Sequence, residues 1–145
     1  MEHKKLFEQI IAARTLATAL EPFPVPLDLR PYDILMAEGL SLTEDNFIVA
    51  ESTLSWLHDE GLLRCKGKGP APDKTGKFRL EFRKSTLSSA GFDALNQPVN
   101  VSGESVGDVL VDELRKTGGD ARSAVISEII GQIIGAASKS IFGGG

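Results

Sequence analysis

Basic side chains are concentrated in one short stretch of this 145-residue chain. Between Leu63 and Thr86 there are eight lysines and arginines against two acidic residues, a local charge of +6, although the whole chain carries −4. Such a separation favours contact between one face and a polyanion, because Lys and Arg commonly bind nucleic-acid phosphates. The candidate phosphate contacts are Arg64, Lys66, Lys68, Lys74, Lys77 and Arg79. The alternative is a solvated hairpin whose lysines block edge pairing.

The sequence offers no set of residues suited to catalysis or metal binding. Its single cysteine is Cys65, and its two histidines, His3 and His58, lie far apart in sequence, so a His/Cys metal cluster cannot be assembled. The acidic pairs at 59–60 and 112–113 are adjacent, and on a helix adjacent side chains diverge by about 100°, which does not suit shared-proton chemistry. No glycine-rich phosphate-binding motif is present. We therefore expect a protein that is not an enzyme and binds no metal or cofactor.

A helix is expected to precede the basic stretch and to position it. Thr43 is a suitable N-cap, and the two acidic residues after it favour the positive end of the helix dipole. Gly61 is typical of the residue just past a helix end. His58, near that end, is expected to be a solvated surface residue. Apolar residues recur between the two ends at helical spacing, namely Phe47, Ala50, Leu54 and Leu57.

Two strands are predicted within the basic stretch. Leu62–Lys66 has the composition of a strand, and Lys77–Phe82 alternates apolar and charged residues as a half-buried strand does. Gly67–Gly76 contains three glycines and two prolines among polar residues, which predicts a flexible turn. The two strands would form a hairpin with a long loop.

The rest of the chain is predicted to be mainly helical. Val25 and Leu27 alternate as a short edge strand would. Further helices are expected over residues 3–20, 32–38, 88–95, 105–116 and 120–142. The length suits one ordinary domain, or one domain with an appendage. The expected boundaries are a domain over 1–96, a linker over 97–103, a C-terminal helical extension over 104–142 and a frayed tail over 143–145.

This order of elements resembles the winged helix-turn-helix superfamily. The segment Thr53–Leu63 is similar to the end of a recognition helix that turns into the first wing strand. The segment Ser85–Leu95 is similar to the motif after the wing, with Ser88 where the family usually has threonine. The C-terminal part resembles small bacterial and prophage winged-helix proteins of unknown function. The resemblance implies an α+β, mostly helical fold, a winged helix with a small β-hairpin wing and two extra C-terminal helices.

The resemblance also implies a nucleic-acid-binding regulator or accessory protein of a mobile element or prophage. The outward side of the presumed recognition helix carries four carboxylates and no lysine or arginine. We therefore expect the basic wing, rather than this helix, to contact the phosphates of double-stranded DNA. The alternative is a protein-interaction module whose acidic helix docks a partner through Glu51, Ser55 and Asp59.

The last predicted helix carries a broad isoleucine stripe at helical spacing. This stripe can close the core of the monomer, pair with its twin in a homodimer, or lie on a membrane as an effector would. The candidate dimerisation residues are Ile126, Ile129, Ile130, Ile133 and Ile134. Charged residues interrupt the run, so a membrane-spanning helix is not expected. Since no export signal is visible, we expect a cytoplasmic homo-oligomer.

Overall fold

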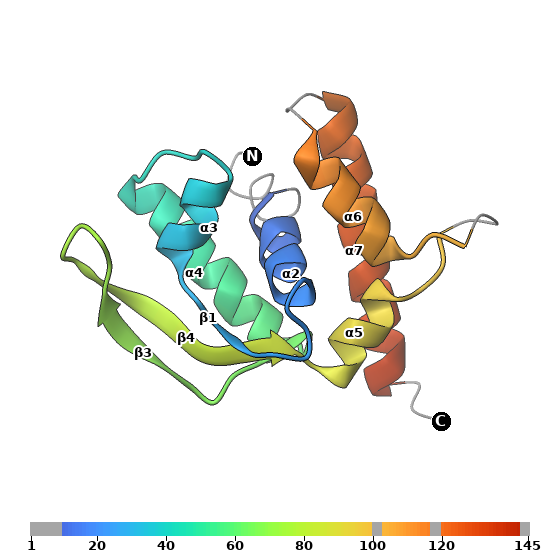
Figure 1. Ribbon diagram of the computed structural model, residues 1–145, viewed down its shortest axis with the longest axis horizontal. Coiled ribbons are helices and arrows are strands. Elements are labelled where there is room, and N and C mark those ends of the chain that lie inside the picture. Colours follow the sequence, from blue (N-terminus) through green and yellow to red (C-terminus); the bar gives the residue numbers. More distant parts are fainter. Residues whose placement is uncertain (1–9, 100–102, 117–119, 143–145) are drawn as a thin grey trace.

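The structure is a computed structural model that describes residues 10–99, 103–116 and 120–142 (Figure 1). Its architecture is α+β and mostly helical, with a small antiparallel sheet. The elements in chain order are α2 (Ala12–Leu20), β1 (Leu27–Leu29), α3 (Pro31–Ala37), α4 (Glu44–Asp59), β2 (Leu63–Arg64), β3 (Gly67–Pro72), β4 (Phe78–Leu87), α5 (Ser89–Leu95), α6 (Val106–Arg115) and α7 (Asp120–Phe142).

Side-chain caps mark the starts of three helices. The Thr43 hydroxyl accepts the backbone N–H three residues further on at 3.2 Å, and the Ser88 hydroxyl does the same at 2.9 Å. Ser105 and Asp108 form a reciprocal capping box at the start of α6. Each cap satisfies a backbone N–H that has no partner within its helix. The helices predicted after these residues are confirmed.

The long strand β4 lies at the centre of the sheet. β1 pairs antiparallel with one edge of β4, and β2 and β3 both pair with the other. Leu63 lies opposite Leu87 and Gly67 lies opposite Arg83, so β2 and β3 keep one register across a break at residues 65–66. The outer strand of the hairpin is therefore one interrupted strand.

The hairpin turn is shorter and more ordered than the sequence predicts. The predicted flexible turn over Gly67–Gly76 is wrong, because its first part forms β3 and only the residues around Asp73 turn the chain. The Asp73 carboxylate accepts the backbone N–H of Thr75 at 2.8 Å and of Lys77 at 3.2 Å. Gly76 has a φ of +88°, which glycine adopts without strain.

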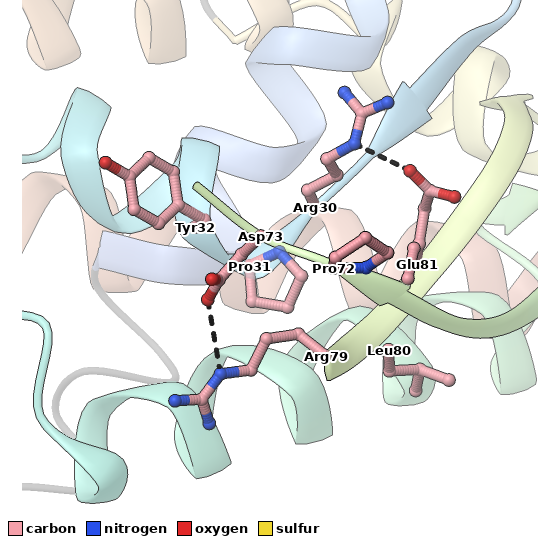
Figure 2. A pocket seen from close by; sticks show the side chains of 9 residues that line it. Arg30, Pro31, Tyr32, Pro72, Asp73, Arg79, Leu80 and Glu81 are labelled. Atoms are coloured by element: carbon pink, nitrogen blue, oxygen red, sulfur yellow. Dashed lines mark hydrogen bonds and ion pairs between the residues drawn. The ribbon is translucent and has the colours of Figure 1, made fainter. Parts of the chain in front are cut away.

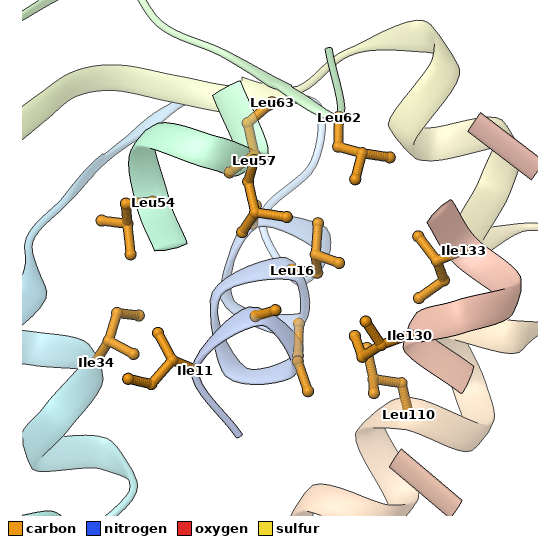
Figure 3. Packing of buried hydrophobic residues seen from close by; sticks show 14 of the residues in the cluster. Ile11, Leu16, Ile34, Leu54, Leu57, Leu62, Leu63, Leu110, Ile130 and Ile133 are labelled. Atoms are coloured by element: carbon orange, nitrogen blue, oxygen red, sulfur yellow. The ribbon is translucent and has the colours of Figure 1, made fainter. Parts of the chain in front are cut away.

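The core runs from α4 through α2 to α7. Figure 3 shows Leu16 of α2 between two groups of buried side chains. Leu54 and Leu57 of α4 lie on one side of it, and Ile130 and Ile133 of α7 lie on the other. Burying one such side chain contributes roughly 1.5–3 kcal/mol. The predicted apolar stripe of α4 is confirmed, since each member is at most 1% exposed: Phe47, Ala50, Leu54 and Leu57.

The isoleucine stripe of α7 closes the core of its own chain. Ile126, Ile129, Ile130 and Ile133 are at most 4% exposed, and Ile134 is half-buried. They belong to a helix that packs against α2, α5 and α6. The assignment of the four buried isoleucines to a dimer contact is corrected, because side chains enclosed by their own chain have no surface left for a second copy, and for the half-buried Ile134 it stays a prediction. Association of copies through another surface stays a prediction.

The predicted domain 1–96 and the predicted extension 104–142 share one buried cluster. α2 packs against both α6 and α7, and α5 packs against α7. Within the predicted linker 97–103, the Gln97 carbonyl accepts the backbone N–H of Val106 at 2.8 Å. The extension is therefore part of the core rather than a separate body.

Some sequence predictions fall on residues outside the described ranges. These are the first part of the helix expected over 3–20, the middle of the linker and the tail over 143–145. Among the described helices, none is both long and apolar enough to span a bilayer.

Candidate nucleic-acid interface

The hairpin of β3 and β4 follows α4 from one end of the helix to the other (Figure 1). At the hairpin tip, Arg79 contacts Glu44, the first residue of α4. At the hairpin root, Ser85 contacts His58 near the end of α4. The helix has 16 residues, so it spans about 24 Å. α4 therefore holds the hairpin, and its cations, at both ends.

The Arg79 guanidinium at the tip is already surrounded by partners. Its Nη1 and Nη2 donate to the two carboxylate oxygens of Glu44 at 3.1 and 2.8 Å, and its Nε donates to Asp73 at 3.4 Å (Figure 2). It also lies 3.8 Å from the centre of the Phe47 ring. The hydrogen bonds to Glu44 raise the pKa of Arg79 and lower that of Glu44. The prediction that Arg79 contacts phosphate is corrected, because Glu44 and Asp73 of the same chain neutralise its charge.

A shallow groove of about 260 Å³ opens beside the tip. Arg30 on its wall donates from Nε to the Glu81 carboxylate at 2.6 Å (Figure 2). The Lys74 ammonium lies 6.0 Å from the centre of the Tyr32 ring. Both signs of charge line the groove, so it favours neither an anion nor a cation. Its lining residues are Arg30, Tyr32, Asp33, Pro72, Asp73 and Lys74.

The two candidate lysines of the tip are exposed, but acidic groups lie near them. Lys77 Nζ is 3.5 Å from a carboxylate oxygen of Glu44. Lys74 lines the same groove as Asp73. A phosphate that approached either lysine would also meet a carboxylate, which repels it. The tip is therefore a poorer phosphate site than the sequence suggests.

Three cations at the root of the hairpin form what we call the basic strip: Arg64, Lys66 and Lys68. They alternate along the outer strand and all three are exposed. Alternate residues of a strand lie about 7 Å apart. None of the three has an ion pair with any residue that the structure describes. The strip thus presents three charges to solvent without internal compensation.

Arg83 and Lys84 add two exposed cations next to the strip. The Arg83 guanidinium crosses β3 where Gly67 and Gly69 leave room, since a Cβ built at either glycine would lie 3.4–3.7 Å from it. Lys84 has a φ of +50°, and its backbone N–H donates to Asp28 at 3.0 Å. A register irregularity between β1 and β4 breaks the alternation here. Both cations belong to the basic stretch of the sequence, but no sequence pattern predicted this bulge.

His58 is half-buried between α4 and β4, so the expectation that it is solvated is wrong. Its ring stacks on Phe82 with the centroids 4.3 Å apart. Nδ1 lies 2.7 Å from the Leu54 carbonyl and Nε2 lies 2.8 Å from the Ser85 hydroxyl. Because a carbonyl only accepts, Nδ1 donates and Nε2 accepts the hydroxyl proton. Burial lowers the pKa of His58. Ser85 is fully buried, so this pair is structural.

The residues proposed for protein contact lie on the outward side of α4. Asp59 is exposed, and Glu51 and Ser55 are half-buried. The same side carries Ile48, which is 58% exposed. Ile48 lies off the apolar stripe of α4 in the sequence, and this position is the signal that could have marked it as exposed.

No metal centre is visible in the part of the chain that the structure describes, where no three His, Cys, Asp or Glu side chains gather. No protein-family model, curated protein or solved structure matches the chain. Its function is therefore inferred from its own residues.

Proposed function

We propose that this chain is a winged-helix module whose basic strip binds the phosphate backbone of double-stranded DNA. The topology supports the fold assignment: helix α2, strand β1, helices α3 and α4, and then a hairpin whose second strand, β4, is the central strand of the sheet. The observation that carries the proposal is the set of exposed cations at the hairpin root that have no ion pair with any described residue. When cations without internal partners neutralise phosphates, they displace the counterions that are condensed on the DNA. The release of these counterions drives association.

The contact is expected to discriminate little between sequences. Base reading in the major groove usually needs Arg, Lys, Asn or Gln on an exposed helix face. The outward side of α4 instead presents Asp45, Ile48, Ser52 and Asp59. Binding through the strip would recognise the backbone alone. Such binding suits an accessory or regulatory factor that works beside a sequence-specific partner.

A pair of matched double variants tests the proposal. Lys66→Ala with Lys68→Ala removes two charges from the strip, and Lys74→Ala with Lys77→Ala removes two from the tip. In fluorescence anisotropy titrations with a labelled duplex at low salt, the strip variant should bind at least about tenfold more weakly, and the tip variant should change far less. Equal losses would mean that only net charge matters. No binding by the wild-type protein would reject the proposal.

A further inference from the structure

The hairpin tip presents an aromatic ring to solvent. Phe78, the first residue of β4, is 70% exposed, more than any other large apolar side chain in the described part of the chain. It lies outside the buried cluster, and no other ring among the described residues stacks on it. Most of its apolar surface is therefore in contact with water. The ring contributes little to the core and is open to a ligand.

The backbone that carries Phe78 is fixed on three sides. Phe78 lies opposite Pro72 in the register of β3 and β4. Before it, the Lys77 backbone N–H donates to the Asp73 carboxylate at 3.2 Å. After it, the Arg79 guanidinium donates to the first residue of α4 at 2.8 Å. A ring on an ordered backbone loses little further conformational entropy when it binds, which favours affinity.

The root and the tip of the hairpin suit different parts of a nucleic acid. The basic strip at the root has exposed cations without an ion pair to any described residue, which suits phosphates. At the tip, carboxylates lie near Lys74 and Lys77, which disfavours a phosphate. A nucleobase is uncharged, so these carboxylates do not repel it, and its π-face can stack on an aromatic ring. A base is therefore the part of DNA that fits Phe78.

The spacing of the two sites fits one DNA molecule. Lys68 of the basic strip lies opposite Phe82, and Phe78 is four residues from Phe82 along β4. Four residues of a strand span about 13 Å, which is the axial length of about four base pairs. One duplex can therefore meet the basic strip with its phosphates and Phe78 with a base a few positions away.

We propose that Phe78 stacks on an unpaired base of DNA whose phosphates the basic strip binds, a step that rests on the proposed DNA contact. A base inside an intact duplex already stacks on both neighbours, and separating them costs free energy. A base that is unpaired, as in a bulge, exposes its π-face at a lower cost. The protein therefore prefers a duplex with an unpaired base. The identity of this base matters little, because every base can stack.

Two duplexes that differ only in one base test the base contact. Both carry the same phosphates and a one-nucleotide bulge, which holds an adenine in the first duplex and an abasic site in the second. In fluorescence anisotropy titrations at low salt, wild type should bind the adenine bulge at least about fivefold more tightly than the abasic bulge. Phe78→Leu keeps an apolar side chain without a ring, so it should bind both duplexes equally. Phe78→Trp should keep the preference.

Val25→Ala is the matched control for the loss of an exposed apolar group. Val25 is 62% exposed and lies just before β1, which pairs with the other edge of β4. This variant should keep the wild-type preference for the adenine bulge. Lys66→Ala with Lys68→Ala should weaken the binding of both duplexes and leave the ratio of their affinities unchanged, because the phosphate contacts are separate from the base contact.

The outcomes separate the base contact from the proposed function. If wild type binds both duplexes with equal affinity, the base contact is overturned while the phosphate contact stands. A preference that survives in Phe78→Leu, with a native circular dichroism spectrum, would overturn it as well, because another group would then contact the base. If wild type binds neither duplex, the proposed function fails and the base contact fails with it.

Discussion

At the residue scale, the contact between Gly91 and Leu62 shows how α5 is fixed to the end of α4. A Cβ built on Gly91 would lie 2.1 Å from the Leu62 carbonyl oxygen. That oxygen accepts the backbone N–H of Ser88 at 3.0 Å, and the Ser88 hydroxyl caps α5. The sequence motif from Ser85 to Leu95 predicted the helix. It did not reveal this approach of two backbones, because the partner lies far along the chain.

Gly91→Ala should therefore destabilise the protein strongly. The added methyl group meets backbone rather than a flexible side chain, and overpacking of this kind costs about 3 kcal/mol. Gly131→Ala is the matched control, since nothing lies within 4 Å of a Cβ at Gly131 in α7. It should stabilise the chain by up to about 1 kcal/mol through helix propensity. Urea unfolding measures both, and equal effects would contradict the close packing of α5.

His58 should make stability depend on pH. Its folded pKa is lowered from 6.5 by burial, so below pH 6.5 the unfolded chain takes up a proton that the folded chain resists. The contribution of neutral His58 to the free energy of unfolding is therefore fully present above pH 6.5. It is lost as the pH falls from 6.5 through the lowered pKa of the folded state. In urea unfolding between about pH 5 and 7, His58→Gln should have the flatter profile. If the stability of variant and wild type changed with pH in parallel, folding would not change the pKa of His58, which would contradict this prediction.

At the element scale, the hairpin turn owes its shape to Asp73. Asp73→Ala removes the acceptor of the backbone N–H groups of Thr75 and Lys77. Hydrogen exchange of these two amides should become faster, while the amides of α2 keep their protection. Asp73→Asn is the control, since its amide oxygen can still accept. Unchanged exchange in the alanine variant would mean that the turn holds without this carboxylate.

The hairpin also shows where sequence patterns stop being informative. The alternation of Lys77–Phe82 predicted a strand, and β4 covers most of that segment before continuing to Leu87. β3 was missed because glycine and proline read as a loop, although an outer strand tolerates both. The composition of the sequence revealed the basic stretch. It did not reveal which cations lack an ion pair, because Arg79 and Glu44 come into contact only when the hairpin packs along α4.

At the scale of the whole molecule, α7 completes the core. The stripe was readable from the sequence, but its partner was not, since a helical stripe looks the same whether it packs on its own chain or on a second one. Ile130 and Ile133 are buried beside α2, so their side chains pack on their own chain.

A fragment of residues 1–96 should therefore fail to fold alone. Without α6 and α7, Leu16 and its apolar neighbours on α2 and α5 would be exposed to water. The full chain should unfold in one cooperative transition when followed by circular dichroism and by Trp56 fluorescence. A fragment with its own cooperative transition would restore the predicted boundary near residue 96.

The most direct test of the central claim is the salt dependence of duplex binding. Each phosphate contact contributes a slope of about −0.9 to the logarithm of the binding constant against that of salt concentration, so the three cations of the basic strip should give about −2.7. Removing Lys66 and Lys68 should leave a slope near −0.9, with one contact remaining. A slope that stays the same in this double variant, or wild-type binding that does not respond to salt, would contradict the account.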